Sequence, residues 1–311
     1  MKIKKFLLAA FAIVFLGSLV PIFFVYLEKE PSPQTNAQAL ERIKNNQGEL
    51  FGFIVLGDSH TGIIPTDSTF LKVIQDVNME GRWKKLPIDF VADLGDVTFR
   101  GSAWDYKVFN KLRSKIKWPV ISAIGNHDDD NKEGAALFAR YVGPRDFSFA
   151  ERNSYFIFTD NNRDQTYPDE QFAWLEGELK KSQAYKHRFI FMHKSPISAR
   201  FHHFYRPEVS SWSQRFMKLC EQYKVDIVFT GHEHLFREQE FGGVRYVVSG
   251  GAGMPLDVPR WEGGFLNYVV VRVNGDYVDY EVEQVFPPVW RFVTLTIWQD
   301  AFYFLRDAFF R

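Results

Sequence analysis

The sequence predicts an α/β fold built as a two-sheet sandwich with helices on the outside. In the first half, apolar runs typical of buried strands alternate with stretches of helical spacing. Beyond residue 231 the predicted strands follow one another closely. The chain has 311 residues, of which 46% are hydrophobic, and this is enough for a large buried core.

Five of the predicted strands carry Asp, Asn or His side chains directly after their apolar run. The run over residues 51–57 leads into Asp58 and His60, the run over 88–94 into Asp96, and the run over 119–124 into Asn126, His127 and Asp128. The run over 187–192 leads into His193, and the run over 225–230 into His232 and His234. Ligands of open α/β sheets bind outside the carboxyl ends of the strands, so we expect these side chains to share one site. The alternative for each residue alone is a structural polar group at a strand end.

The remaining elements follow from spacing and turn residues. Helices are predicted over residues 67–79, 102–115, 168–179 and 212–223, and further strands over residues 153–159, 235–241, 244–249, 265–273 and 277–285. The last two strands flank Asn274-Gly275, which is a strong signal for a hairpin turn. Together these segments predict one domain over residues 49–286.

The N-terminus has the pattern of a membrane anchor. A basic tail over residues 1–5 precedes an uncharged apolar stretch over residues 6–27. As a helix, that stretch would be about 33 Å long, which is enough to span a bilayer core. A cleaved signal is the alternative, with Ala37-Gln38-Ala39 as its cleavage site, but such signals have an apolar stretch of only about 7–15 residues.

The anchor predicts a topology. Lysines before a span stay on the cytoplasmic side, so we expect a single-pass membrane protein with a cytoplasmic N-terminus. The domain would then face outward, into a periplasm or another extracytoplasmic space. Residues 28–48 are polar and contain Pro31 and Pro33, so we expect a linker that lifts the domain off the membrane.

Residues 287–311 are expected to form an aromatic amphipathic helix after Pro287-Pro288 ends the last strand. Apolar residues gather on one helical face, whereas Asp300 and Arg306 make a membrane span expensive. Two interpretations stay open, because this face could lie in the membrane interface or pack on the sandwich itself.

Charge and cysteine content exclude some classes of protein. Lys and Arg together number 38, as do Asp and Glu, so the net charge of zero gives no electrostatic footprint for nucleic acid. The single cysteine, Cys220, excludes an internal disulfide, and its place in a helix-like run predicts a buried side chain.

The strand-end residues match, in order and spacing, the motifs of one enzyme family. These motifs are Asp58 and His60, Gly95-Asp96, Gly125-Asn126-His127-Asp128, His193, and Gly231-His232 with His234. Over roughly residues 51–283 the chain therefore resembles the calcineurin-like metallophosphoesterases. The resemblance implies a four-layer αββα sandwich of two mixed sheets, and an enzyme that hydrolyses phosphoesters with two divalent metal ions.

The resemblance also implies a role for each motif residue. One metal would be held by Asp58, His60, Asp96 and His234, and the other by Asp96, Asn126, His193 and His232, with Asp96 as the bridge. A bridging hydroxide would attack phosphorus. His127 would act as the acid toward the leaving group, and Asp128 would orient His127.

One departure bears on the metals. Purple acid phosphatases of this superfamily have a metal-bound tyrosine three residues after the bridging Asp, and this position is Phe99 here. We therefore expect manganese, iron(II) or zinc rather than a ferric tyrosinate centre.

The substrate is less sharply defined by the sequence. The basic segment after His193, with Lys194, Arg200, His202, His203, Tyr205 and Arg206, is a candidate rim for phosphate. A phosphodiester, a nucleotide or a lipid-linked phosphoester is favoured. The alternatives are a phosphomonoesterase, or a scaffold that keeps the fold without catalysis.

Overall fold

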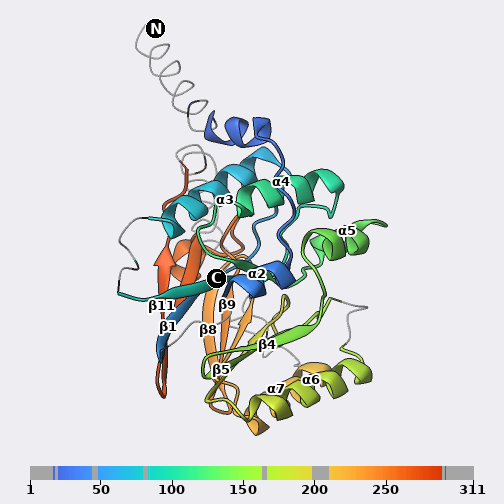
Figure 1. Ribbon diagram of the computed structural model, residues 1–311, viewed down its shortest axis with the longest axis vertical. Coiled ribbons are helices and arrows are strands. Elements are labelled where there is room, and N and C mark those ends of the chain that lie inside the picture. The colour runs from blue at the N-terminus through green and yellow to red at the C-terminus, as the bar shows by residue number, and fades with distance from the viewer. Residues whose placement is uncertain are drawn as a thin grey trace, which may run out of the picture.

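The computed structural model describes residues 17, 20–43, 48–79, 83, 85–162, 167–197, 210–288 and 291. Its core is a sandwich of two mixed sheets with helices on both outer faces (Figure 1). The first sheet has the strand order β11-β10-β1-β2-β3, and the second has the order β4-β5-β6-β7-β9-β8. The predicted sandwich of two mixed sheets flanked by helices is therefore confirmed.

Each sheet combines a set of parallel strands with antiparallel strands. In the first sheet β1 pairs parallel with β2, and β2 with β3; in the second, β5, β6, β7 and β9 run parallel in that order. The strands are β1 (Leu50–Leu56), β2 (Ile88–Asp93), β3 (Val120–Ser122), β4 (Phe147–Glu151), β5 (Ser154–Phe158), β6 (His187–Phe191), β7 (Ile227–Thr230), β8 (Phe236–Phe241), β9 (Val244–Ser249), β10 (Asn267–Asn274) and β11 (Tyr277–Gln284).

Most of the helices lie in connections between parallel strands, whereas one precedes β1 and another lies between β3 and β4, which belong to different sheets. They are α2 (Asn36–Ile43), α3 (Ile64–Val77), α4 (Ala103–Arg113), α5 (Gly134–Tyr141), α6 (Asp169–Ser182) and α7 (Ser211–Gln222), with the 3-10 turns η1 (His127–Asp129) and η3 (Arg260–Glu262). α4 starts at Ser102, whose hydroxyl accepts a bond from the amide of Asp105 in a capping box. This agrees with the predicted helix start at residue 102.

Alternation along β1 divides its side chains between two hydrophobic layers. Phe51, Phe53 and Val55 face the second sheet, and Ile54 and Leu56 face α3 and α4. The layer between the sheets is rich in phenylalanine, and a third layer joins the second sheet to α6 and α7. Strand pairing and these three layers hold the carboxyl ends of the central strands in fixed positions.

The segment expected to be a linker is packed on the domain. Asn36 exchanges two 2.9 Å hydrogen bonds with the backbone of Ser122 in β3, and Ala39 and Ile43 lie in the buried layer between the sheets. Residues 36–43 form α2, which the sequence analysis did not predict. Short elements β4 and α5 were also not predicted. The structure thus differs from the expected free linker over residues 28–43.

Both ends of the chain lie largely outside the described residues. Among the residues that the structure describes, no helix is long and apolar enough to cross a membrane. Of the expected anchor over residues 6–27, residues 17 and 20–27 are described and are helical. Of the expected C-terminal helix over residues 287–311, only residues 287, 288 and 291 are described.

Candidate metal centre

The two sheets bring the strand-end residues together at one edge of the sandwich. Asp58 and His60 follow β1, Asp96 follows β2, and Asn126 and His127 follow β3, all in the first sheet. His193, His232 and His234 follow β6 and β7 in the second sheet. Nε2 of His193 lies 3.2 Å from Oδ2 of Asp96, so residues from the two sheets meet directly.

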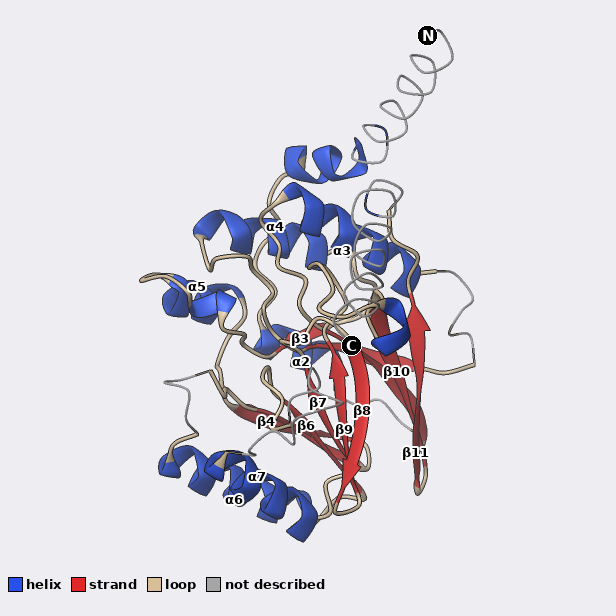
Figure 2. Cartoon of the chain, turned by 180° about the vertical axis from the view of Figure 1, so that it is seen from behind, coloured by secondary structure: helices blue, strands red, loops and turns tan. Residues whose placement is uncertain are grey.

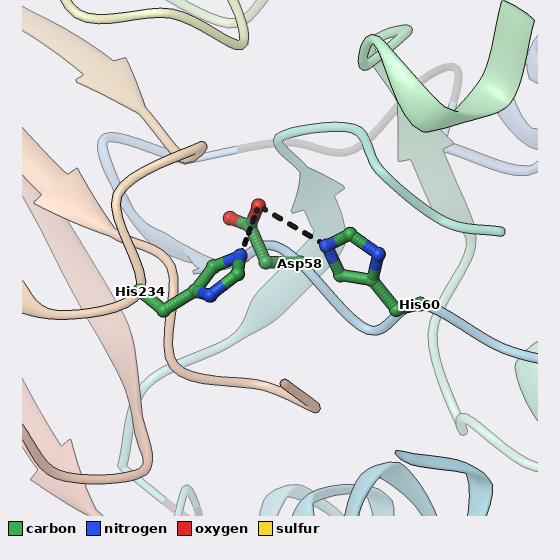
Figure 3. A group of neighbouring side chains, drawn as sticks. All are labelled: Asp58, His60 and His234. Carbon is green, nitrogen blue, oxygen red and sulfur yellow. Dashed lines mark ion pairs between the residues drawn. The ribbon is translucent and has the colours of Figure 1, made fainter. Parts of the chain in front are cut away.

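The first group of potential ligands is Asp58, His60 and His234. Nε2 of His60 lies 3.8 Å and Nε2 of His234 lies 3.6 Å from Oδ1 of Asp58 (Figure 3). Asp58 and His60 are fully buried, and all three ligand atoms lie within 4.8 Å of one another. The arrangement is that of a pocket for one cation with two imidazoles and a carboxylate.

Asp96 joins this group to a second one. Asp96, His193 and His232 also have ligand atoms within 4.8 Å of one another. Nε2 of His60, from the first group, lies 3.4 Å from Oδ2 of the same Asp96. A carboxylate has two oxygens, so Asp96 stands where it could bridge two ions.

His127 lies beside His60 and Asp96. Its ring centroid is 4.6 Å from that of His60, and its ligand atom falls within 4.8 Å of His60 and Asp96. The amide of His127 donates a 2.7 Å hydrogen bond to Oδ1 of Asp96. The backbone of the Gly125–Asp128 turn is thereby tied to the carboxylate that joins the groups.

Several buried atoms at this edge lack the hydrogen bonds that buried polar atoms normally have. Within the described part of the chain, both ring nitrogens of His60, Nε2 of His193 and Oδ1 of Asn126 have no hydrogen-bond partner. An unsatisfied buried polar atom costs about 1–3 kcal/mol. Nitrogen and oxygen donors of this kind suit zinc, iron and manganese, so the residues present fit the implied metals.

Three histidines are oriented by backbone carbonyls. The Nδ1 atoms of His193 and His234 lie 3.0 Å from the carbonyl oxygens of Leu94 and Pro255, and Nδ1 of His127 lies 2.8 Å from that of Phe99. A carbonyl can only accept, so Nδ1 carries the hydrogen and Nε2 is free to act. No sequence signal could have found these partners, because every residue has a carbonyl.

The charges around the site favour metal-binding forms. Burial would raise the pKa of Asp58 and of Asp96, but the surrounding histidines outweigh it and hold both pKa values below the ordinary range. Burial and the neighbouring His193 lower the pKa of His232 to about 4. At neutral pH the carboxylates are therefore charged and His232 is neutral.

His193 behaves differently. Burial lowers its pKa, but Asp96 and Asp58 outweigh this effect and raise the pKa to about 9. A metal ion that binds Nε2 would therefore displace a proton.

The backbone at the site adopts conformations that L-residues rarely take. Asp58, His60, Asp96 and His232 have φ values of 64°, 45°, 50° and 67°. Only two other non-glycine residues in the described ranges, Arg152 and Lys224, have positive φ. The left-handed region costs an L-residue roughly 1–2 kcal/mol, so strain is concentrated where the ligands are.

Gly125 shows how tightly the turns pack. A Cβ atom at this position would lie 2.1 Å from both the amide nitrogen and Oδ1 of Asp96. Only glycine lets the Gly125–Asp128 turn approach Asp96 this closely.

The hydrogen bonds that the structure gives the Asp128 carboxylate go to neighbouring loops, whereas the expected partner was the imidazole of His127. The Asp128 carboxylate accepts bonds from the amides of Gly125, Val97 and Thr98 and from the hydroxyl of Thr98, at 2.8–3.3 Å. Burial and the nearby Asp96 raise its pKa to about 7. Asp128 therefore joins the turn after β3 to the loop after β2, and the carbonyl of Phe99 orients His127.

Comparison with known proteins places this site in a family. The family model described as calcineurin-like phosphoesterase matches residues 51–236, which is more than half of the chain. The chain belongs to this family. The predicted superfamily is confirmed, and membership implies a centre of two divalent metal ions and supports the prediction of a phosphoesterase.

Relatives of this phosphoesterase-family chain are distant. A protein of Arabidopsis thaliana named "Probable inactive purple acid phosphatase 24" is 23% identical over 269 residues, which cover 69% of this chain and 42% of the relative. The chain thus spans less than half of the length of that curated relative.

Two solved structures share the fold. Purple acid phosphatase PPD1 from yellow lupin superposes with a TM-score of 0.59 at 17% identity, covering 78% of this chain and 53% of that one. GAP50, described as the anchor in the inner membrane complex of Plasmodium, has a TM-score of 0.56 at 12% identity, covering 77% of this chain and 90% of that one. At these identities the likeness shows the fold alone.

Phe99 stands where purple acid phosphatases have a metal-bound tyrosine. Its ring stacks on His127 at a centroid distance of 6.3 Å and lies 6.4 Å from that of His60. A phenyl ring offers no ligand atom, so Phe99 serves as an apolar wall and as the carbonyl partner of His127.

The expected substrate rim is described only in part. Lys194 is half-buried, and its backbone exchanges hydrogen bonds of 3.0 and 2.6 Å with the side chain of Asn161. The other basic candidates, from Arg200 to Arg206, lie outside the described residues.

Proposed function

We propose that this chain is a metal-dependent hydrolase of phosphoesters. The observation that carries the proposal is the sharing of Asp96: one buried carboxylate stands within 3.4 Å of His60 from the first ligand group and within 3.2 Å of His193 from the second. Two adjoining cation pockets with one common carboxylate are what a dinuclear phosphoesterase needs.

The two ions would be held as the family resemblance implies, with Asp58, His60, Asp96 and His234 around one and Asp96, Asn126, His193 and His232 around the other. When bound, the ions would activate water as the nucleophile and neutralise charge on the phosphate oxygens. The buried, strained loops would keep these ligands fixed before substrate arrives, and this lowers the reorganisation that the reaction requires.

His127 is assigned the proton transfer. Its Nδ1–H donates to the carbonyl of Phe99, so Nε2 is the atom available to a substrate. In its protonated form, Nε2–H would donate a proton to the leaving oxygen. Asp128 would act on this step only through the backbone, because its carboxylate bonds to Gly125, Val97 and Thr98.

For the substrate we favour a phosphodiester, a nucleotide or a lipid-linked phosphoester over a monoester. For the metals we favour manganese, iron(II) or zinc, since Phe99 offers no phenolate. Purified protein with the purple colour of a ferric tyrosinate would contradict the choice of metals.

Hydrolysis of p-nitrophenyl phosphate and bis-p-nitrophenyl phosphate by the full-length chain in detergent, with Mn²⁺, tests the proposal. We expect Asp96→Asn and His127→Ala each to reduce the rate about 100-fold or more, because they remove the shared ligand and the proton donor. The preferred ester assigns the enzyme as a diesterase or a monoesterase. Full activity in both variants would refute the assignment.

A non-catalytic scaffold is the second candidate, and the names of two similar proteins favour it. One is called inactive and the other an anchor. Against it stands the presence of His127 with the complete ligand set. A protein that binds no metal when Mn²⁺ is supplied and hydrolyses neither ester would favour the scaffold.

We further propose that the apolar stretch over residues 6–27 anchors the chain in a membrane, with the N-terminus cytoplasmic and the folded domain outside. Ile22 and Val25 are buried against the domain, so residues 20–27 would form the end of the anchor at the outer membrane surface. The support is the uncharged apolar run and the three lysines before it. A C-terminal alkaline phosphatase fusion is expected to be active, and an inactive fusion would overturn this topology.

A further inference from the structure

The helical segment formed by residues 20–27 is apolar on both of its faces. One face packs on the domain: Ile22 and Val25 are 1% and 3% exposed and belong to the layer beneath α3 and α4. The other face is open, with exposed fractions of 45% for Val20, 49% for Phe23, 65% for Phe24 and 83% for Leu27.

The open residues form a continuous stripe rather than scattered contacts. Positions 20, 23, 24 and 27 follow the i, i+3, i+4, i+7 spacing of one helical face. Trp104, at the start of α4, extends the stripe: it is 51% exposed, and its ring lies 5.7 Å from that of Tyr26. We call Val20, Phe23, Phe24, Leu27 and Trp104 the outer apolar face.

A helix that is apolar all round is normally covered on all sides, either by protein or by lipid. The sequence directly before this one continues without a charge from Phe6 to Leu19, after a basic tail. The outer apolar face is therefore the described end of a longer apolar run in the sequence. Trp and Phe beside a helix end are also the side chains that favour the membrane interface.

We propose that the outer apolar face lies in the interfacial layer of a lipid bilayer, so that the domain rests on the membrane. The packing of residues 28–43 supports this arrangement. Nζ of Lys115 lies 2.7 Å from the carboxylate of Glu28, and Asn110 donates a 2.6 Å hydrogen bond to the carbonyl of Pro31. The chain leaving the helix is thus fixed to α4 and does not act as a free tether.

The same helix is connected to the metal loop. The hydroxyl of Tyr26 donates to Asp67, whose Oδ1 accepts a 2.8 Å bond from the amide of Gly62. The indole of Trp104 donates a 3.3 Å bond to the carbonyl of Gly62. Gly62 lies two residues after His60, so the outer apolar face and a predicted metal ligand are held by one short network.

The position of the outer apolar face in the membrane interface bears on the substrate, and this inference rests on the proposed function. A metal loop beside the bilayer surface is suited to phosphoesters whose apolar part remains in the lipid. We therefore infer that the substrate is a phosphodiester carried by a lipid, hydrolysed at the membrane surface.

The cysteine content makes the docking directly testable. Cys220 is the only cysteine, it is fully buried, and burial raises its pKa, so it reacts poorly with thiol reagents. Phe24→Cys and Leu27→Cys would each carry one accessible thiol for a fluorophore. Tyr277→Cys is the matched control, since Tyr277 is 79% exposed and the β10–β11 turn lies at the opposite end of the molecule (Figure 2).

The labelled full-length proteins would be reconstituted in phosphatidylcholine vesicles, and the fluorescence of each probe would be measured with a quencher in the lipid and with a quencher in the water. We expect probes at positions 24 and 27 to be quenched by doxyl-labelled lipid and protected from aqueous iodide, and the probe at 277 to show the reverse. Quenching of the first two by iodide would overturn the proposal. Protection from both quenchers would also overturn it, because protein would then cover the face.

The substrate inference has its own test, with methyl and hexadecyl p-nitrophenyl phosphate as diesters that share one leaving group. In vesicles, Phe24→Glu with Leu27→Glu is expected to lower hydrolysis of the hexadecyl ester about tenfold and to leave that of the methyl ester nearly unchanged. Tyr277→Glu should change neither. Equal losses on both esters would contradict the inference, and wild-type protein without activity on either would refute the proposed function instead.

Discussion

His187 is the first residue of strand β6, and His193 lies two residues after its end. Both are buried beside a carboxylate. Nδ1 of His187 lies 3.2 Å from Asp226, and Nε2 lies 2.9 Å from the carbonyl oxygen of Gly275, so both ring nitrogens are in hydrogen bonds. Nε2 of His193 lies 3.2 Å from Asp96 but forms no hydrogen bond within the described structure. A buried histidine with both nitrogens satisfied is structural, whereas one with an open nitrogen is suited to a metal.

The contrast extends to the two ends of the sandwich. Near His187, Arg152 pairs with Asp89 through two bonds of 2.9 and 3.0 Å, which satisfy both charges. Left-handed residues occur at both ends, since Arg152 itself has a φ of 55°, but open ligand atoms gather at the metal edge. One end therefore stabilises the apo fold, and the other holds unsatisfied groups that metal binding would satisfy.

Exchanging each histidine for glutamine tests this contrast most severely. We expect His193→Gln to lose one of the two metals and to lower activity by more than about 100-fold, since even the loss of a group behind a ligand costs about 10–100-fold. His187→Gln should retain both metals and nearly full activity. Elemental analysis and bis-p-nitrophenyl phosphate hydrolysis measure the two effects.

Thermal unfolding separates a lost ligand from a misfolded protein. Apo His193→Gln should still unfold in one cooperative transition, at a temperature below that of the apo wild type, because the protonated imidazole of His193 pairs with Asp96. If His193→Gln binds two metals and keeps its activity, the ring nitrogen of His193 that lacks a hydrogen bond does not bind a metal needed for hydrolysis.

A pair of glycine substitutions sharpens the comparison further. In Gly125→Ala the new Cβ would lie 2.1 Å from Asp96, so Asp96 or the turn must move. A shift of about 1 Å can cost on the order of 100-fold in rate, and we expect a loss of this size. Gly177→Ala is the control: it lies in α6 with nothing within 4 Å, and alanine should stabilise the helix by about 0.5–1 kcal/mol.

The rate of bis-p-nitrophenyl phosphate hydrolysis and the free energy of unfolding in denaturant are measured for both variants. Wild-type activity in Gly125→Ala would mean that the close approach of the turn to Asp96 is not needed for the site.

Much of this contrast could be predicted from sequence. Apolar runs followed by Asp58, Asp96 and His193 predicted both the strands and the edge at which their polar residues meet, because strand burial and parallel pairing depend on side-chain pattern. His187 was not among the predicted site residues, since it begins its strand instead of following it, and in the structure both of its ring nitrogens are in hydrogen bonds.

What sequence could not supply depends on the backbone and on packing. The left-handed φ of Asp58 and His60, and the carbonyl that orients His127, leave no mark in residue identity. Residues 28–43 have the polar, proline-containing composition of a linker, yet Asn36 pairs with the edge strand β3 and becomes buried. Strand β4 is half-exposed at a sheet edge, so its pattern was too weak to detect.

The smallest expected effect is a pH dependence at the His187 end. Burial lowers the pKa of His187, but the hydrogen bonds to Asp226 and Gly275 outweigh it and raise the pKa above its ordinary value of 6.5. A raised folded-state pKa means that the folded protein binds the proton more tightly than the unfolded chain does. The resulting stability is fully present below pH 6.5 and is lost as the pH rises through the folded pKa.

Urea unfolding of wild type and His187→Gln between pH 6 and pH 9 measures this contribution. The difference in their unfolding free energies should shrink as the pH rises, because only the wild type loses the charged pair. Titration of the metal-edge histidines is common to both proteins and cancels in the difference. A difference that is constant or grows with pH would show that His187 is not charged in the fold, and the two ends of β6 would then differ in hydrogen bonding but not in protonation.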